Sequence, residues 1–226
     1  MSHPRSSGPT GRPDARRAGW SAVAACVILA ALTLWVTRSP GHLLPGDAGL
    51  HGWSAAHRPP TAAAAARMVT DTGTGVFPYA VLLVAGLYAG RTARRRCAVG
   101  VALMACLGAG QALRYAFMSL VARPRPPVGD WAAHASGWSF PSGHASTGAM
   151  TAALVLAALA VAGRRASRLA AVLIGLWGVS VGLTRVYLGV HWITDVLAAW
   201  LFAVGWVSLV VWAYLRWGPA PVRKEQ

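Results

Sequence analysis

The sequence contains few charged residues, and acidic residues are the scarcest of all. Charged side chains make up 12% of its 226 residues, and only 6 residues are Asp or Glu, whereas an ordinary soluble domain carries roughly 25% charged residues. Asparagine is absent. With 55% hydrophobic residues, the chain is too apolar to remain disordered and has too few polar residues to cover a water-facing surface. The composition therefore excludes a disordered chain and argues against a soluble protein.

Cysteine is scarce as well. The three cysteines, Cys26, Cys97 and Cys106, lie in or beside apolar stretches. Their number and placement provide neither a disulfide framework nor the spacing of a metal site.

The apolar residues form long blocks, and six of these blocks are candidate membrane spans. Crossing the hydrocarbon core takes about 20 helical residues, so the second block is short and the third is long enough to tilt. We predict an all-α polytopic membrane protein, with a six-helix transmembrane domain over residues 20–215 and cytoplasmic tails at residues 1–19 and 216–226. The blocks are Trp20–Thr37, Thr74–Gly90, Ala98–Val121, Ala145–Ala162, Leu169–Val186 and Thr194–Leu215.

A signal peptide is the alternative interpretation of the first block. Residues 23–26, Val-Ala-Ala-Cys, resemble a lipoprotein cleavage box. However, this box stands at the beginning of the apolar run, whereas cleavage sites follow it, and no small-residue site precedes Arg38. The sequence therefore favours a first span that is retained.

The basic residues indicate how the spans are oriented. The formal net charge is +15, which in a soluble protein would indicate nucleic-acid binding. Here, however, most basic residues cluster in alternate connections, at residues 5–17, 91–96, 164–168 and 216–224. By the positive-inside rule these connections are cytoplasmic. Twenty of the 21 basic residues are arginine, and this bias towards GC-rich codons, like the absence of asparagine, indicates a high-GC bacterial genome. We predict a bacterial plasma-membrane protein with both termini inside and no nucleic-acid partner, in which the connection Ser39–Asp71 lies outside and its Ala-rich run forms a short helix on the membrane.

Unusual polar residues on the outer side fall at three places, and the first is the segment Arg123–Pro127, which reads Arg-Pro-Arg-Pro-Pro. Taken alone, this segment is a proline-stiffened loop with two solvated arginines. Alternatively, the prolines fix the backbone so that Arg125 faces a bound anion. A planar guanidinium suits phosphate because it can donate two parallel hydrogen bonds.

The second place is Phe140-Pro141-Ser142-Gly143-His144, directly before the fourth block. A turn followed by a helix cap would explain the serine and the glycine. A helix that begins here also directs free N–H groups and the positive end of its dipole outward, so Ser142, Gly143 and His144 would form an anion cradle. The imidazole of His144 is suited to proton transfer in such a cradle.

The third place contains Thr184-Arg185, followed by His191 and Asp195. Four residues separate His191 from Asp195, so the two share one face if the segment is helical. Asp195 would then accept from one ring nitrogen and leave the other unprotonated, as in nucleophile–base–acid triads. An ordinary capping pair is the alternative. Asp195 is nevertheless the only acid within the six blocks, and an ionisable residue inside a membrane indicates function.

Together, the three places bring two histidines, an orienting carboxylate, several arginines and a helix N-terminus to one membrane face. Arginines would repel a cation, so the set predicts no metal, and nothing in it indicates another cofactor. A serine hydrolase would need a histidine bonded to Ser142, whereas the excess of arginine indicates a dianionic substrate. Phosphoryl transfer depends mainly on positioning and on neutralising oxygen charge, and it fits these residues best.

These residues resemble the three signature motifs of the type 2 phosphatidic acid phosphatase superfamily, which shares its phosphatase core with vanadium haloperoxidases. The similarity extends over about residues 118–195 and agrees with the six-span layout of the bacterial membrane members. It is carried by Arg125-Pro126, by Pro141-Ser142-Gly143-His144, and by Thr184-Arg185 with His191 and Asp195.

The resemblance implies a role for each matching residue. His191 would attack phosphorus and form a phosphohistidine, and Asp195 would hold its ring. His144 would protonate the leaving oxygen and then activate water. The groups implied to hold the phosphoryl oxygens are Arg125, Arg185, Ser142 and the amide of Gly143.

The sequence departs from the family pattern at two positions. Thr184 replaces the usual serine, which is a mild change. Met118 stands where the family places a lysine, seven residues before Arg125. Arg114, one helical turn before Met118, is the residue that we expect to supply the missing cation.

We therefore expect an integral-membrane lipid phosphatase whose substrate is a lipid phosphate or pyrophosphate at the outer face. Undecaprenyl pyrophosphate is the leading candidate because an outward site suits recycling of a carrier lipid. Phosphatidic acid and phosphatidylglycerophosphate are the alternative substrates. A lipid-phosphate-binding protein weakened by Met118 is a further alternative, against which the two histidines argue because binding needs only the arginines. Membrane lipids are the other expected partners.

Overall fold

The computed structural model describes residues 11–164 and 166–218, and all regular secondary structure in these residues is helical. This confirms the predicted all-α class. The α-helices are α1 (Gly11–Arg38), α2 (Asp47–Ala56), α3 (Pro60–Asp71), α4 (Val76–Ala89), α5 (Ala93–Val121), α6 (Gly143–Val161), α7 (Arg168–Tyr187) and α8 (Ile193–Trp217). Two 3₁₀ turns, η1 (Pro40–His42) and η2 (Val128–Asp130), lie in the connections.

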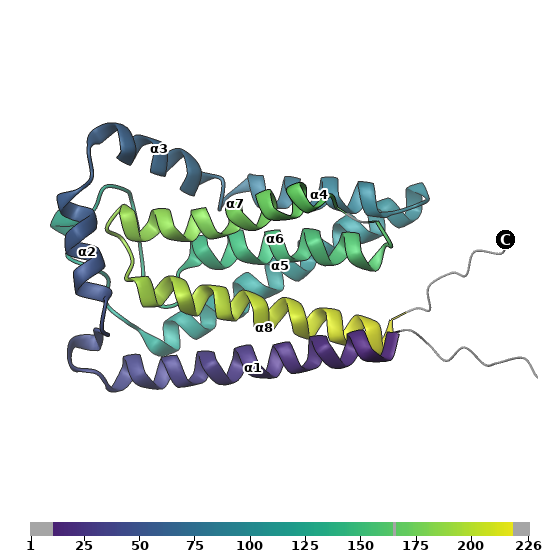
Figure 1. The fold of residues 1–226 in the computed structure, drawn as a ribbon, viewed down its shortest axis with the longest axis horizontal. Helices are drawn as coiled ribbons and strands as arrows, with labels where there is room; N and C mark the ends of the chain where they lie inside the picture. Colours follow the sequence, from purple (N-terminus) through teal and green to yellow (C-terminus); the bar gives the residue numbers. More distant parts are fainter. Residues whose placement is uncertain (1–10, 165, 219–226) are drawn as a thin grey trace, which may run out of the picture.

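The helices form a bundle with α6 at its centre. α6 packs against α4, α5, α7 and α8, and α1 packs on the outer side of α8. Ten of the 19 residues of α6 are buried. α2 lies across one end of the bundle, and α3 leads from it to α4 (Figure 1). This arrangement places the N-terminus of α6 in the middle of the end that α2 covers.

Within residues 11–164 and 166–218, five helices are long and apolar enough to cross a membrane alone, namely α1, α5, α6, α7 and α8. The second predicted span corresponds to α4, which has 14 residues and is therefore about 21 Å long at 1.5 Å per residue. It is long and apolar enough to cross a membrane only together with α3, and the two helices are bent by 50° relative to each other. The described part of the chain thus has five candidate spans, or six if α3 and α4 form one broken span.

The expected tails are only partly described. α1 begins at Gly11, so residues 11–19 of the expected N-terminal tail are helical. Residues 1–10, residue 165 and residues 219–226 lie outside the described residues. The Ala-rich run within residues 39–71 is helical, as predicted, and forms α3.

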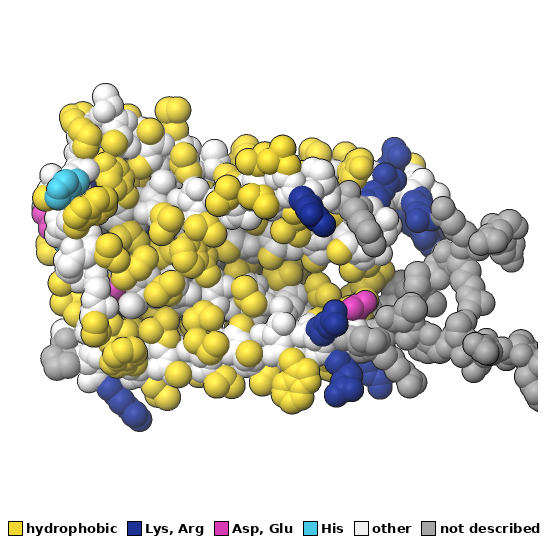
Figure 2. All heavy atoms as spheres, in the orientation of Figure 1, with side chains coloured by type: hydrophobic (Ala, Val, Ile, Leu, Met, Phe, Trp, Pro, Cys, Tyr) yellow, Lys and Arg dark blue, Asp and Glu magenta, His cyan; other side chains and the backbone are white. Residues whose placement is uncertain are grey.

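The outer surface of the bundle is apolar along the helices. Large hydrophobic side chains such as Trp20, Val84, Leu120 and Leu176 are exposed, and yellow apolar side chains cover most of the face in Figure 2. Dark blue basic side chains gather at the end where α1 begins and α8 ends (Figure 2). Such a surface suits contact with lipid along its length and with water at its ends.

Candidate active site

The predicted site residues meet at the end of the bundle that α2 covers. The loop 122–142 joins α5 to α6 there, and the loop 188–192 joins α7 to α8 (Figure 1). The starts of α6 and α8 and the ends of α5 and α7 therefore converge. Three motifs that are separate in the sequence become neighbours at this end.

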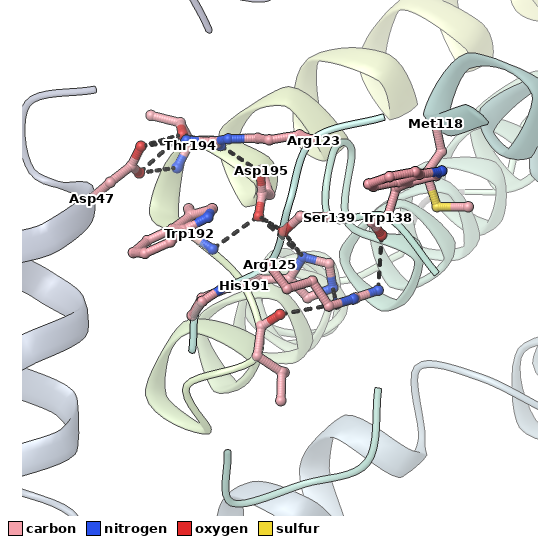
Figure 3. A network of polar contacts seen from close by, with 12 residues as sticks. Asp47, Met118, Arg123, Arg125, Trp138, Ser139, His191, Trp192, Thr194 and Asp195 are labelled. Carbon is pink, nitrogen blue, oxygen red and sulfur yellow. Dashed lines mark hydrogen bonds and ion pairs between the residues drawn. The ribbon is translucent and has the colours of Figure 1, made fainter. Parts of the chain in front are cut away.

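His191 is held between a carboxylate and a guanidinium. Its Nδ1 lies 3.2 Å from Oδ2 of Asp195, and its Nε2 lies 2.8 Å from Nη1 of Arg125 (Figure 3). A guanidinium only donates hydrogen bonds, so Nε2 accepts and Nδ1 carries the proton that is donated to Asp195. The unprotonated nitrogen is therefore the one that faces the arginine.

The surroundings of His191 keep its ring neutral. His191 lies in the loop before α8 and is 2% exposed. Burial lowers the pKa of His191 to about 4, although the hydrogen bond to Asp195 acts in the opposite direction. At physiological pH the imidazole is therefore uncharged and can act as a nucleophile.

Asp195 is fully buried in the first turn of α8, and its carboxylate binds three groups besides His191. Oδ2 accepts from the backbone N–H of Trp192 at 2.9 Å and from the hydroxyl of Ser139, and Oδ1 accepts from Arg123 at 2.5 Å. His191 precedes α8, so it does not share a helical face with Asp195 as the sequence predicted. The helix cap aligns the pair instead, because Asp195 bonds back to the amide of the N-cap residue.

Arg123 is completely buried, so the interpretation of this residue as a solvated loop arginine is wrong. Its guanidinium donates to Asp195 and, at 2.6 Å, to Oδ2 of Asp47 in α2. It also donates to the hydroxyl of Thr194 at 2.7 Å and to the carbonyl of His42. Because a buried arginine needs compensating charge, its position depends on two carboxylates supplied by other segments (Figure 3).

Arg125 is surrounded by carbonyl oxygens. Its Nε and Nη2 donate to the carbonyls of residues 136, 137 and 138 at 2.8, 3.0 and 2.9 Å, and Nη1 donates to that of Val190 at 2.9 Å. Together with the contact to His191, these bonds use all five N–H donors of the guanidinium. Arg125 therefore fixes the loop around His191 here, and it must release an acceptor before it can hold a phosphoryl oxygen.

The N-terminus of α6 provides a smaller anion cradle than the sequence predicted. The amide of Ser142 donates to the carbonyl of Asp195 at 3.1 Å, so it is not free for an anion, whereas the first amides of the helix, beginning with those of Gly143 and His144, have no partner within the helix. The buried hydroxyl of Ser142 has no hydrogen-bond partner among the described residues. A bound anion would satisfy this hydroxyl.

A cavity of about 420 Å³ opens beside the start of α6. Nη1 of Arg114 lies 3.1 Å from Sδ of Met118, and a Cβ on Gly143 would lie 3.5 Å from the same nitrogen. The guanidinium of Arg114 thus reaches the start of α6, as it must if Arg114 replaces the cation that is missing at Met118. The cavity is lined by Thr74, Gln111, Ala112, Arg114, Tyr115, Gly143, His144 and Thr147.

Arg185, near the end of α7, is 2% exposed and incompletely bonded. It makes two long hydrogen bonds, to the hydroxyl of Thr70 at 3.4 Å and to the carbonyl of His134 at 3.3 Å. Its buried Nε has no partner within residues 11–164 and 166–218. Arg185 therefore keeps a donor available for an anion.

His144 lies where these groups meet. It lines the cavity together with Arg114, and the positive charges of Arg185 and Arg125 also act on its ring. All eight site residues predicted from the sequence are thus at one end of the bundle, and His144 lines the open cavity there.

Three residues that support Asp195 were missed in the sequence, namely Asp47, Arg123 and Ser139. Arg123 and Ser139 adjoin predicted motifs, and that proximity was a usable signal. Asp47 bonds to Thr194, which lies 147 positions away. Its only signal was that acids are rare in this chain.

The sequence and the fold are similar to those of known proteins. Residues 97–219 match the family described as the PAP2 superfamily. Phosphatidylglycerophosphatase B of Bacillus subtilis (strain 168) is 30% identical over 141 residues, which are 61% of this chain and 66%, just under two thirds, of that protein. The fold is similar to a crystal structure described as that of the first transmembrane PAP2 type phosphatidylglycerolphosphate phosphatase from Bacillus subtilis, with a TM-score of 0.70 and 20% sequence identity. The match covers 92% of this chain and 100% of the chain in that structure. That likeness establishes the fold.

Proposed function

The chain belongs to the PAP2 superfamily and is a multi-pass membrane protein, and we propose that it is a lipid phosphatase that forms a phosphohistidine at His191. The observation that carries this proposal is the state of the ring: Nδ1 donates to Asp195, and an unprotonated Nε2 faces Arg125. The unpartnered polar atoms of Ser142 and Arg185 support it further, because they are buried where phosphoryl oxygens would need donors.

The proposed reaction has two steps. First, Nε2 of His191 attacks phosphorus while the bond to the leaving oxygen breaks, and His144 gives its proton to that oxygen. Asp195 stabilises the positive charge that the ring then carries. Second, His144 takes a proton from water, the water oxygen attacks phosphorus, and the P–N bond breaks to release inorganic phosphate. The groups proposed to hold the phosphoryl oxygens are Arg114, Arg185, Ser142, the amide of Gly143 and Arg125, whose Nη1 must leave Nε2 of His191 before that nitrogen can attack phosphorus.

Two lipid substrates are proposed. Phosphatidylglycerophosphate is supported by the 30% identity to phosphatidylglycerophosphatase B. Undecaprenyl pyrophosphate is supported by the position of the site, at the end of the bundle opposite the gathered basic side chains (Figure 2). Both lipids carry a terminal phosphate on a head group that is attached to an apolar tail.

We also propose that the end with the basic side chains is cytoplasmic, together with both termini, and that the active site faces outward. After replacement of the three native cysteines, a cysteine at Gly129 should react with an impermeant thiol reagent added to intact cells. A cysteine at Arg95 should react only after permeabilisation. The reverse pattern would contradict the orientation and remove the support for undecaprenyl pyrophosphate.

Phosphate release from each lipid by purified protein in detergent and EDTA tests the function. The wild type and His134→Ala, which removes an exposed histidine at the same end, should release phosphate, whereas His191→Ala should not. Turnover by His191→Ala, or strict dependence on a divalent cation, would contradict the proposal. The lipid with the higher kcat/KM identifies the substrate.

A further inference from the structure

We infer that Asp47 and Arg123 are positioning residues of the active site, because together they fix the place and the net charge of the carboxylate behind His191. This inference rests on the proposed role of His191 as the nucleophile. Asp47 lies outside residues 97–219, the part of the chain that matches the family. The chain of contacts from Asp47 through Arg123 to Asp195 is visible in Figure 3.

The contacts that carry this inference are closed to water. The side chains of Asp47, Arg123 and Asp195 are all 0% exposed, and the two ion pairs measure 2.6 and 2.5 Å. Asp47 also accepts from the amide of Leu44 at 3.0 Å and from the amide of Thr194 at 3.1 Å. The carboxylate of Asp47 is therefore engaged within the protein, and none of these three residues lines the cavity.

Asp47 connects α2 to the beginning of α8. It is the first residue of α2, and Thr194 lies in the first turn of α8. The amides of that turn have no partner within their own helix, so a carboxylate from α2 binds one of them and holds the turn in place. Asp195 is the next residue in this turn and bonds to the same arginine. A change at Asp47 therefore acts on the carboxylate that orients His191.

The same contacts set the charge behind His191. Arg123 carries one positive charge and bridges two carboxylates, so the group of three carries one net negative charge. When Nε2 of His191 bonds to phosphorus, the ring keeps its Nδ1 proton and becomes positive. Without the charge of Asp47, Arg123 would neutralise Asp195, and the positive ring would lose its balancing charge. Asp47 is thus expected to favour formation of the phosphoenzyme.

Asp47→Asn tests this inference, because it keeps the size and one acceptor oxygen but removes the charge. The full chain in detergent is mixed with dioleoyl phosphatidic acid, and acid-labile phosphoenzyme is measured by rapid quench. We expect the rate constant of its formation to fall about tenfold, with KM unchanged because Asp47 does not line the cavity. Asp47→Glu, which retains the charge, should form phosphoenzyme faster than Asp47→Asn.

The rate constant separates positioning from mere stabilisation. A variant that is merely partly unfolded forms a smaller amount of phosphoenzyme, but at the wild-type rate constant, and that result would overturn the inference. Equal rate constants for Asp47→Asn and Asp47→Glu would also overturn it. Asp130→Asn is the matched control, since it removes another acid at this end, one that pairs with His51 at 2.9 Å, and it should keep the wild-type rate constant. If the wild type forms no phosphoenzyme, or His191→Ala still forms it, the proposed function fails instead.

Discussion

The two halves of the active site differ in how far their polar groups are paired. Around the start of α8, the side chains of His191, Asp195 and Arg123 are buried and bonded to one another or to neighbouring groups. Around the start of α6, the hydroxyl of Ser142 has no partner among the described residues, and Arg114 donates to a thioether beside a cavity of about 420 Å³. We call the half around the start of α8 the closed half and the half around the start of α6 the open half. The closed half is organised before substrate arrives, whereas the open half keeps its donors for an anion. This is the division expected when the nucleophile is preorganised and binding is completed by the substrate.

The largest loss should come from the closed half. His191→Ala removes the proposed nucleophile and should lower kcat by more than about four orders of magnitude, with no acid-labile phosphoenzyme. Rapid quench with a lipid phosphate measures both quantities. A phosphoenzyme trapped in this variant would place the nucleophile elsewhere, and the closed half would then hold no reacting atom.

His144 lies between the halves, and its replacement should have the next largest effect. Because His144 is proposed to protonate the leaving oxygen, His144→Ala should lower kcat by roughly two to four orders of magnitude on a lipid phosphate. The loss should be smaller on p-nitrophenyl phosphate, whose leaving group departs without a proton. Equal losses on the two substrates would contradict the assignment of His144 as the acid.

Arg123→Ala tests the closed half through stability. The change leaves the buried carboxylates of Asp47 and Asp195 without their shared cation and should reduce the free energy of unfolding by about 3–5 kcal/mol. Thermal unfolding in detergent measures the shift, with Arg38→Ala as the control, because Arg38 is exposed and its loss should cost less than about 0.5 kcal/mol. Equal Tm values for the two variants would show that the ion pairs do not hold the closed half together.

Most of the fold was predictable because long apolar blocks in a sequence directly indicate membrane-spanning helices. The predicted block Ala145–Ala162 corresponds to α6 (Gly143–Val161), and Leu169–Val186 corresponds to α7 (Arg168–Tyr187). The second block was recognisably short, but the 50° bend that joins α4 to α3 was not predicted. The break between the two helices falls at residues 72–75, where Gly75 adopts a φ of 63°, so the glycines were a local signal for a break that the prediction did not use.

The two halves of the site were not equally predictable. Ser142, Gly143 and His144 are adjacent in the sequence, so their position at a helix start followed from local rules of capping. Arg123 appears in the sequence as one of two similar arginines in a polar loop. Its burial follows from contacts with Asp47 and Asp195, and contacts over such separations depend on how α2 crosses the bundle. Local patterns therefore identified the open half and missed the support of the closed half.

The smallest effect should come from Arg114, in the open half. Its guanidinium donates to Sδ of Met118 at 3.1 Å, and a thioether is a weak acceptor, so a phosphoryl oxygen would bind it better. Arg114→Ala should lower kcat/KM by one to two orders of magnitude, or roughly 1.4–3 kcal/mol of transition-state stabilisation. Arg96→Ala is the control because it removes the same charge from the other end of α5, and it should leave kcat/KM unchanged.

Met118→Lys provides the complementary test of the open half. Met118 is 7% exposed and lies one turn from Arg114, so in the Arg114→Ala background a lysine amine would have the space that the guanidinium leaves. Part of the lost kcat/KM should return, because the family pattern places an ammonium at this position. If Arg114→Ala keeps full kcat/KM, or if the lysine restores nothing, Arg114 does not replace the missing cation. The open half would then depend on Arg185 and on release of Arg125 from its carbonyl contacts.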